Sequence, residues 1–303
     1  MSIRIVPVET LVQQPTGLDP LLLPRPTELY RARAARLHSL AAQHPMGDYL
    51  RLAARIVEAQ LGLVMRQPVL LPERGDYFRQ CAEHGLPPLG AVAWPREALW
   101  REGLRALCRE LAQALTGPAA EVAARLAEAP DALLEGYAQD LLSGQYERVP
   151  VGEAPFVWAA LAAHFSQLAS QLKVAAIPEP GDHRHLCPVC GSAPVASMQQ
   201  IGARSGLRYL HCGLCESEWH LVRAKCSNCE DSRDLGYWSL DDREAAVRAE
   251  SCGACGSYLK LVSLDRDAAA DAVADDLATL ALDARMEEEG FARSSLNPFL
   301  FPG

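Results

Sequence analysis

Eight of the ten cysteines in this 303-residue chain form four C-x-x-C pairs between residues 187 and 255. A two-residue gap lets both sulfurs of a pair turn toward one point, and two pairs supply the four thiolates of a tetrahedral metal site. The sequence therefore predicts two such sites. The candidate ligands are Cys187, Cys190, Cys212, Cys215, Cys226, Cys229, Cys252 and Cys255.

The spacing of the pairs indicates which of them share a metal. The first and second pairs are separated by 21 residues and the third and fourth by 22, whereas the second and third are separated by only 10. The third pair begins 39 residues after the first, and the fourth begins 40 residues after the second. A duplication explains both offsets. We therefore predict that pairs one and two form one zinc-ribbon or rubredoxin-like unit, and pairs three and four a second.

The residues that follow the pairs fit tight turns around a metal. Gly191 and Gly256 follow the outer pairs, at positions where the chain needs a positive φ. Glu216 and Glu230 follow the inner pairs, so the turn is expected at Gly213 or Asn228 instead.

Strand-like segments flank the pairs. Residues 207–211 enter the second pair and residues 218–222 leave it, with Trp219, Leu221 and Val222 available for a small core. A further strand is expected at 258–264. A unit of about 40 residues buries too little apolar surface to fold alone, so metal is expected to supply the missing stability.

Alternatives to metal fit the cysteine pattern less well. Residues 1–14 lack the apolar core of a secretion signal, which favours a cytoplasmic location and metal ligands over disulfides. A thioredoxin-type redox motif uses one pair at a helix start, not four in tandem. Since eight cysteines complete two sites, the nearby histidines are not expected as ligands. These are His183, His185 and His211.

Spacing does not identify the metal, because thiolates suit zinc, copper(I) and iron alike. A site closed by four sulfurs has no open position for a substrate, which predicts a structural role.

Residues before the cysteine pairs show helical periodicity. The predicted helices are 27–40, 48–67, 96–115, 121–129, 131–142 and 155–173. Five prolines between residues 68 and 95 predict a long irregular excursion over the surface. Cys81 and Cys108 are expected to be inert thiols, and His164 a hydrogen-bonded core histidine.

These patterns predict an α+β multidomain chain. An N-terminal arm and all-α helical bundle occupy residues 1–180, the first rubredoxin-like metal unit 181–222 and the second 223–264. A C-terminal helix and tail follow at 265–303. Residues 265–290 carry nine acidic and two basic side chains, which predicts an acidic outer face on a helix at 267–290, either solvated or in contact with a basic partner. The apolar tail at 298–301 is expected to dock.

Charge and missing motifs limit the functions that fit. The chain has a net charge of −9. Residues 187–260 carry eight basic and nine acidic side chains, and two four-thiolate sites make this region more negative. Nucleic-acid binding is therefore disfavoured. The segment 156–172 is too polar for a membrane span, so no membrane insertion is expected. No Gly-rich phosphate loop, nucleophile elbow or H-E-x-x-H motif is present, which favours a binding protein over an enzyme.

Several sequence runs resemble the formate dehydrogenase accessory protein family, FdhE. The runs are Cys187–Ser192, Pro194–Ser197, Leu207–Cys212, Glu218–His220, Lys225–Cys229, Asp275–Leu280 and Asn297–Leu300. The resemblance is specific from about residue 183 to the end. In the helical half it rests on the length and order of elements.

This resemblance implies a non-catalytic, cytoplasmic maturation factor for respiratory formate dehydrogenases, the molybdenum and iron–sulfur enzymes exported folded by the twin-arginine route. It also implies binding to the catalytic subunit, iron in two rubredoxin-like sites held by the eight paired cysteines, and a homodimer. Zinc is the alternative metal. The resemblance leaves open what the protein does to this catalytic subunit, its client: holding it, adjusting its redox state and controlling its quality all fit. The alternative functions are a rubredoxin-like electron carrier and a zinc-ribbon nucleic-acid-binding regulator.

Overall fold

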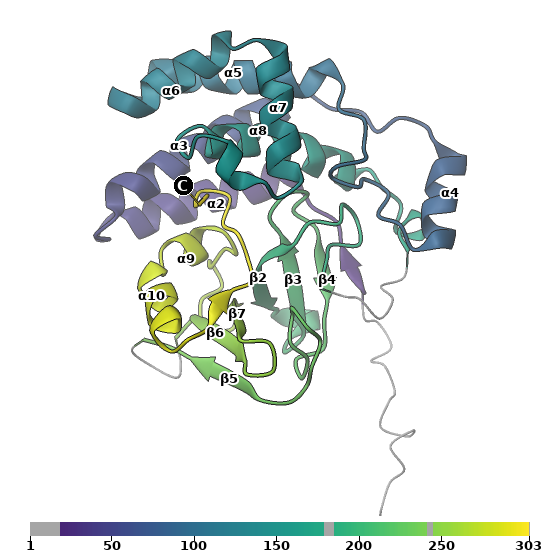
Figure 1. Cartoon of the computed structure of the whole chain (residues 1–303), viewed down its shortest axis with the longest axis vertical. Helices are drawn as coiled ribbons and strands as arrows, with labels where there is room; N and C mark the ends of the chain where they lie inside the picture. The colour runs from purple at the N-terminus through teal and green to yellow at the C-terminus, as the bar shows by residue number, and fades with distance from the viewer. Residues whose placement is uncertain (1–18, 179–184, 241–244, 303) are drawn as a thin grey trace, which may run out of the picture.

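Helix α8 (Ala154–Ser170) runs through the middle of the helical half, and its residues from Ala154 to Ala169 are buried (Figure 1). Its sequence is rich in alanine and large apolar residues on all sides, a pattern typical of a helix with no solvent-exposed face. Helices α2, α3, α5 and α7 contact it. The core of the helical half is therefore built around one element.

The computed structural model describes residues 19–178, 185–240 and 245–302. Most of the expected N-terminal arm lies outside this part of the chain, as do residues 179–184, which include His183. The other helices of the helical half are α2 (Pro26–Ala41), α3 (Gly47–Arg66), α4 (Gly75–His84), α5 (Ala98–Ala114), α6 (Gly117–Glu128) and α7 (Asp131–Leu142), with short 3-10 turns at Tyr146–Arg148 and Val174–Ala176.

The predicted helices are confirmed, but the prediction that residues 68–95 contain no regular element is wrong because α4 lies within them. The prolines stand before and after this helix, so they mark its ends. Gly85 ends it with a φ of 67°. Helix α6 also begins earlier than predicted, because Pro118 fits a first helical turn, where no backbone N–H is needed.

Within the described residues, all eight strands belong to one sheet. The order is β1-β4-β3-β2-β7-β6-β5, and β8 pairs with β7. The strands are β1 (Leu21–Leu22), β2 (Pro194–Gln199), β3 (Arg208–Cys212), β4 (Glu218–His220), β5 (Leu235–Trp238), β6 (Val247–Cys252), β7 (Ser257–Ser263) and β8 (Ala292–Arg293). The sheet lies at the opposite end of the molecule from α5, α6 and α7 (Figure 1).

The sheet reflects the duplication seen in the cysteine spacing. Strands β2, β3 and β4 form an antiparallel set around the first two cysteine pairs, and β5, β6 and β7 form the equivalent set around the last two. The two sets join through a parallel pairing in which Ser197 faces Leu261 and Gln199 faces Ser263. The two three-stranded sets therefore share a continuous backbone hydrogen-bond network. Of the predicted core residues, Trp219 and Leu221 are buried but Val222 is exposed.

The C-terminal segment differs from the prediction of one helix. It forms two short helices, α9 (Ala274–Leu277) and α10 (Leu280–Glu288), with Thr279 between them. Asp275, Asp276 and Asp283 are buried and pair with basic residues of this chain. Part of the segment's negative charge is therefore neutralised inside the protein, while Asp265, Glu287, Glu288 and Glu289 remain exposed.

The end of the chain packs back onto the helical half, as predicted. Phe299 and Phe301 are buried, and the Phe301 ring lies 5.6 Å from the ring of Trp158 on α8. Among the described helices, none is both long and apolar enough to cross a bilayer.

Candidate metal centres

The structure brings the eight paired cysteines together as two groups of four, in the pairing that the spacing predicts. We call the group from pairs one and two the first cluster and the group from pairs three and four the second cluster. In each cluster the sulfurs lie within 4.8 Å of one another. The first cluster contains Cys187, Cys190, Cys212 and Cys215, and the second contains Cys226, Cys229, Cys252 and Cys255.

The sulfur separations fit a tetrahedral metal site. Cys187 Sγ lies 3.5 Å from Cys215 Sγ, and Cys190 Sγ lies 3.4 Å from Cys212 Sγ. In the second cluster the two corresponding separations are both 3.8 Å. A metal about 2.3 Å from each of four thiolates requires sulfurs about 3.8 Å apart. Each cluster could therefore hold one ion by small movements of its sulfurs.

The turn after each inner cysteine pair is made by a glutamate, contrary to prediction. Glu216 has a φ of 60° and Glu230 a φ of 61°. This left-handed conformation is the one that Gly191 and Gly256 adopt after the outer pairs. Gly213 and Asn228, which were expected to carry these turns, do not have a positive φ. A non-glycine residue pays about 1–2 kcal/mol for this conformation, so both glutamates need other contacts to offset the strain.

The first cluster is enclosed by the helical half. We call the turn that carries each cysteine pair a knuckle and number the knuckles in chain order. The segment after α4 forms two backbone hydrogen bonds with the first knuckle, from Leu89 N to Val189 O at 2.9 Å and from Ala91 N to Cys190 O at 2.8 Å. Trp158 on α8 donates to Gly213 O in the second knuckle at 2.8 Å. As a result, the four cysteines of this cluster are between 0 and 2% exposed.

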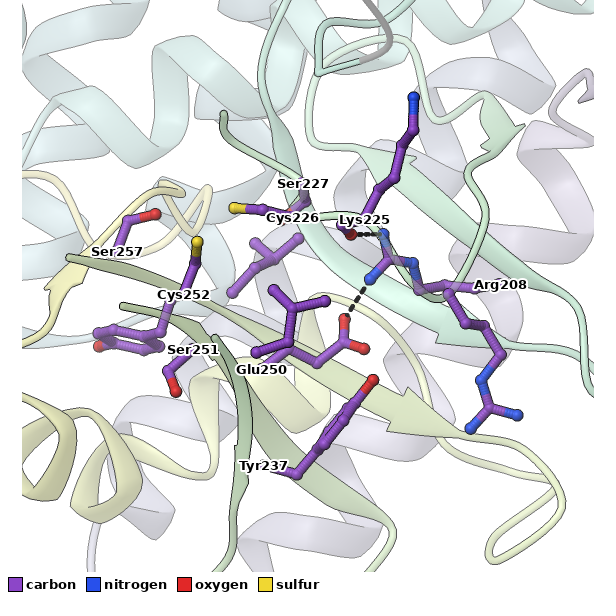
Figure 2. Close-up of a pocket in the computed structure, with 13 residues that line it drawn as sticks. Arg208, Lys225, Cys226, Ser227, Tyr237, Glu250, Ser251, Cys252 and Ser257 are labelled. Atoms are coloured by element: carbon purple, nitrogen blue, oxygen red, sulfur yellow. Dashed lines mark hydrogen bonds and ion pairs between the residues drawn. The ribbon is translucent and has the colours of Figure 1, made fainter. Parts of the chain in front are cut away.

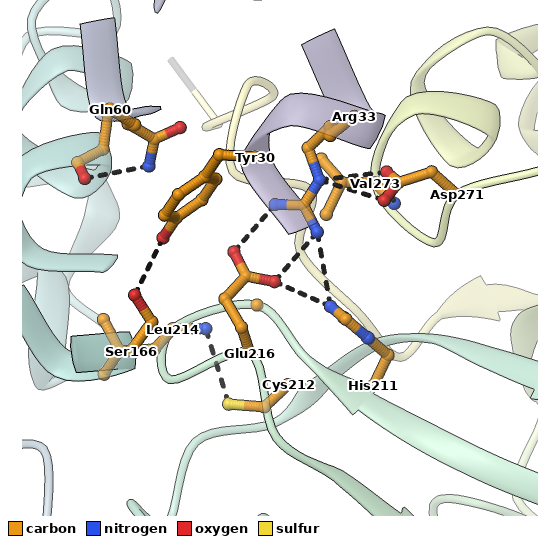
Figure 3. A network of polar contacts seen from close by, with 12 residues as sticks. Tyr30, Arg33, Gln60, Ser166, His211, Cys212, Leu214, Glu216, Asp271 and Val273 are labelled. Carbon is orange, nitrogen blue, oxygen red and sulfur yellow. Dashed lines mark hydrogen bonds and ion pairs between the residues drawn. The ribbon is translucent and has the colours of Figure 1, made fainter. Parts of the chain in front are cut away.

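A buried network of charged side chains fixes the second knuckle (Figure 3). Arg33 on α2 donates to both carboxylate oxygens of Glu216, at 2.7 and 2.8 Å. Its Nε donates to Asp271, in the segment after β7. The ring of His211 on β3 lies between two carboxylates, with Nε2 2.7 Å from Glu216 and Nδ1 3.1 Å from Glu218. One network thus links the helical half, the first cluster and the C-terminal segment.

This network sets the charge of its members. Burial would raise the pKa of Glu216, but the adjacent Arg33 and His211 outweigh burial and lower that pKa to about 2. Burial would lower the pKa of His211, yet its hydrogen bonds to Glu216 and Glu218 raise it to about 9. At neutral pH the imidazolium therefore donates from both nitrogens.

Burial also raises the pKa of Cys187, Cys212 and Cys215 well above the usual thiol value. Four thiolates in such a position need a cation to compensate their charge. Backbone donors are aimed at the sulfurs as well, since Leu214 N and Cys215 N each lie 3.4 Å from Cys212 Sγ. This donor set suits a metal ion.

The second cluster is closed on one side and open on the other. Cys226 and Cys252 are buried, whereas Cys229 and Cys255 are exposed. Figure 2 shows the closed side, where Cys226 and Cys252 border a cavity of about 10 Å³, with Arg208 bound to Glu250 at its wall. A cavity of this size has room for about one water molecule.

The other candidate residues lie outside both clusters. His185 is 3.7 Å from the carboxylate of Glu230, and His211 belongs to the Arg33 network, so neither joins the sulfurs. Cys81 and Cys108 are buried in the helical half as free thiols, as predicted.

His164 is buried on α8 but is not hydrogen-bonded as predicted, because its Nδ1 has no hydrogen-bond partner among the described residues. Burial lowers the pKa of His164 to about 4, so the ring is neutral at physiological pH.

Sequence reasoning missed the residues that support the clusters. Arg33 is 183 positions from Glu216 along the chain, and no local pattern marks either one as a partner. The sequence offered one signal: Glu216 follows a cysteine pair at the position where Gly191 and Gly256 follow the outer pairs, which indicates that its side chain has a partner.

The family comparisons cover nearly the whole described chain. The family model "FdhE, N-terminal" matches residues 18–182, "FdhE, central domain" matches 186–223 and "FdhE, C-terminal domain" matches 224–300. The boundary between the last two models falls between the two cysteine clusters.

Individual proteins show the same relationship. The chain is 50% identical to a "Protein FdhE homolog" from Klebsiella pneumoniae and to "Protein FdhE" from Salmonella newport, in each case over all of this chain and 99% of the relative. It is 42% identical to the FdhE protein from Pseudomonas aeruginosa, whose crystal structure covers 94% of this chain with a TM-score of 0.86. Identity of this extent, together with matches to all three domain models, shows that the chain belongs to the FdhE family.

Proposed function

We propose that this protein is a cytoplasmic, non-catalytic accessory factor that binds the catalytic subunit of a respiratory formate dehydrogenase and assists its assembly or activation. The observation that carries the proposal is full-length membership of the FdhE family combined with two four-cysteine clusters. Each cluster offers four sulfurs to one ion, which leaves no ligand position for a substrate. This supports a binding role over a catalytic one.

The proposed ligands are the eight clustered cysteines, four for each ion. We propose iron in rubredoxin-like sites, with zinc as the alternative, because both accept tetrahedral thiolate coordination. Visible absorption of anaerobically purified protein distinguishes them: a ferric four-thiolate site is coloured and bleaches on reduction, whereas zinc is colourless in both conditions.

We propose that the contact surface for the client extends beyond the acidic C-terminal segment. Asp275, Asp276 and Asp283 are committed to ion pairs within the chain, so they have little charge to offer a partner. The helical half instead exposes large apolar side chains near α4, among them Leu70, Leu86 and Val92. We propose that these side chains contribute to the surface that binds the client, as an apolar patch would.

The proposal is tested by anaerobic affinity purification of the tagged protein from its own cells, with mass spectrometry of the retained proteins. We expect a formate dehydrogenase catalytic subunit, and we expect it to be lost after Cys212→Ser combined with Cys252→Ser. Cys108→Ser is the matched control, since Cys108 lies outside both clusters. Retention of the client by the doubly substituted protein would refute the metal-dependent form of the proposal. Absence of the client from the unmodified protein would refute the proposal itself.

A rubredoxin-like electron carrier is the second candidate, and the exposure of Cys229 and Cys255 is the observation that favours it. Electron transfer requires close approach to the metal, which an exposed sulfur edge allows. A reversible one-electron couple with turnover by a cellular reductase would support this candidate.

We also propose that the protein assembles as a homodimer. Light scattering of the purified protein tests this assembly.

A further inference from the structure

The two clusters occupy equivalent positions in a duplicated unit but differ in access to solvent. Cys215 of the first cluster and Cys255 of the second are related by a 40-residue offset, and Cys190 and Cys229 by a 39-residue offset. Cys190 and Cys215 are 1% and 0% exposed, whereas Cys229 and Cys255 are both exposed. The duplication thus provides an internal comparison of the same ligand positions in two environments.

The difference comes from what lies over each cluster. The helical half covers the first cluster through Ala91, Trp158 and Arg33, which contact its two knuckles. The sulfur of Cys255 instead has contacts within its own unit. Asn228 Nδ2 lies 3.8 Å from it and Ser257 Oγ 3.0 Å. Gly253 and Ala254, which lie between the two cysteines of this pair, are exposed as well.

Access to the second cluster is one-sided. On its inner face the Arg208–Glu250 pair is buried, with Nη1 2.9 Å from the carboxylate, and the adjoining cavity holds about one water molecule. As far as the described residues define access, a reagent larger than water therefore reaches this cluster at its outer edge, where Cys229 and Cys255 lie.

We propose that the second cluster is a metal-exchange site, at which Cys229 and Cys255 give up or accept an ion in exchange with an external thiolate ligand, while the first cluster keeps its ion as part of the core. This inference rests on the proposal that both clusters bind metal. In each step an incoming thiolate takes the place of one cysteine, which leaves as a thiolate: Cys229 and Cys255 are replaced first, then Cys226 and Cys252, so that the ion leaves with four external thiolates. Ligand number and charge balance, and no oxidant or reductant is required.

The other two ligands of the second cluster are buried. Cys226 and Cys252 are 6% and 1% exposed, and Asn228 N donates to Cys226 Sγ at 3.3 Å. These two ligands remain positioned while the exposed ones exchange. In the first cluster, replacement of any ligand requires the helical half to open first, and such opening is rare in a packed core.

The test measures zinc transfer from zinc-loaded full-length protein to the dithiol 2,3-dimercaptopropane-1-sulfonate. Protein and small molecules are separated at successive times, and zinc in each fraction is quantified. We expect two phases of one zinc per chain each, with the first at least about ten-fold faster because it needs no opening of the core. Release of both ions at one rate would overturn the proposal, as would a faster ion that is assigned to the first cluster.

The assignment uses matched substitutions and one measurement on the unmodified protein. Cys255→Ser is expected to remove the fast phase and leave the slow one, whereas Cys215→Ser, at the equivalent buried position, is expected to remove the slow one. Since Cys215→Ser could prevent folding, native protein is also treated with N-ethylmaleimide and mapped by peptide mass spectrometry. Labelling of Cys229 and Cys255 before the first-cluster cysteines supports the proposal, and equal labelling overturns it. Failure of the client purification leaves these results unaffected, so the two proposals fail separately.

Discussion

Arg33 of α2 and Glu216, the residue after the last cysteine of the first cluster, form a two-point ion pair that is almost fully buried. The side chain of Arg33 is 2% exposed and that of Glu216 is 1% exposed. Arg33 Nη1 and Nη2 lie 2.7 and 2.8 Å from the two carboxylate oxygens. Because these residues belong to different parts of the fold, the pair couples the packing of the helical half to the shape of the first cluster.

Arg33→Gln is expected to lower the free energy of unfolding by about 3–5 kcal/mol, because Glu216 and Asp271 would be left as buried carboxylates without their main cation. Urea unfolding at neutral pH, followed by circular dichroism, measures this change. Arg25→Gln is the control, since the Arg25–Glu28 pair is exposed and worth about 0–1 kcal/mol at most. Equal effects of the two substitutions would contradict the role assigned to Arg33.

Glycine at the two glutamate positions should have unequal effects. Glu230→Gly is expected to change stability by less than about 1 kcal/mol, because relief of the positive-φ strain offsets the loss of its partly exposed pairs with His185 and Lys225. Glu216→Gly relieves the same strain but removes the partner of Arg33, so it should destabilise by about 2–4 kcal/mol. Thermal unfolding of the two variants compares them directly. Similar changes in both would show that the Arg33 pair adds little.

The buried His164 should make the folded protein less stable in mild acid. Burial lowers the pKa of this ring from 6.5 to about 4, so between these values the unfolded chain binds a proton that the folded chain does not. Its contribution is complete above pH 6.5 and is lost as the pH falls toward 4. At pH 5 the loss amounts to about 2 kcal/mol relative to pH 7.5.

His164→Leu should therefore retain about 2 kcal/mol more of its stability than the unmodified protein between pH 7.5 and pH 5. Because Nδ1 has no partner among the described residues, leucine should cost little at pH 7.5. Ser170→Ala, at the exposed end of α8, removes no titratable group and is the control that should keep the original pH dependence. Parallel stability curves for His164→Leu and the unmodified protein would contradict this account.

Cys108→Ala should leave the metal content unchanged. Burial raises the pKa of this thiol to about 12, and it lies outside both clusters. The expected cost is about 1–2 kcal/mol of stability from the small cavity. Elemental analysis of the purified variant checks the metal content. A fall in metal per chain would mean that Cys108 affects the clusters through the core.

The sequence predicts the two four-cysteine clusters well because their signal is local in each pair and repeated along the chain. Two residues between cysteines fix each knuckle, and the duplication fixes which knuckles meet. Most helices are also predicted, since periodic apolar residues record which side of each helix is buried. Helix α4 was missed because its flanking prolines gave a stronger signal than its short apolar face.

Long-range charge pairing was beyond sequence reasoning. Asp276 lies among a run of acids, where solvent exposure was the simplest expectation, yet it is buried beside Lys260 and Arg293. That outcome depends on how the C-terminal segment folds over β7, which no local pattern encodes. The unequal exposure of the clusters has the same origin, because the residues that cover the first cluster come from α2, α8 and the segment after α4.

Native mass spectrometry of the protein purified without oxygen or chelator tests metal binding by the two clusters most directly. We expect two metal ions per chain, with a mass that corresponds to four deprotonated cysteines around each ion, and a single ion after Cys255→Ser. A chain without metal, or one whose mass reveals disulfides among the eight clustered cysteines, would contradict this expectation.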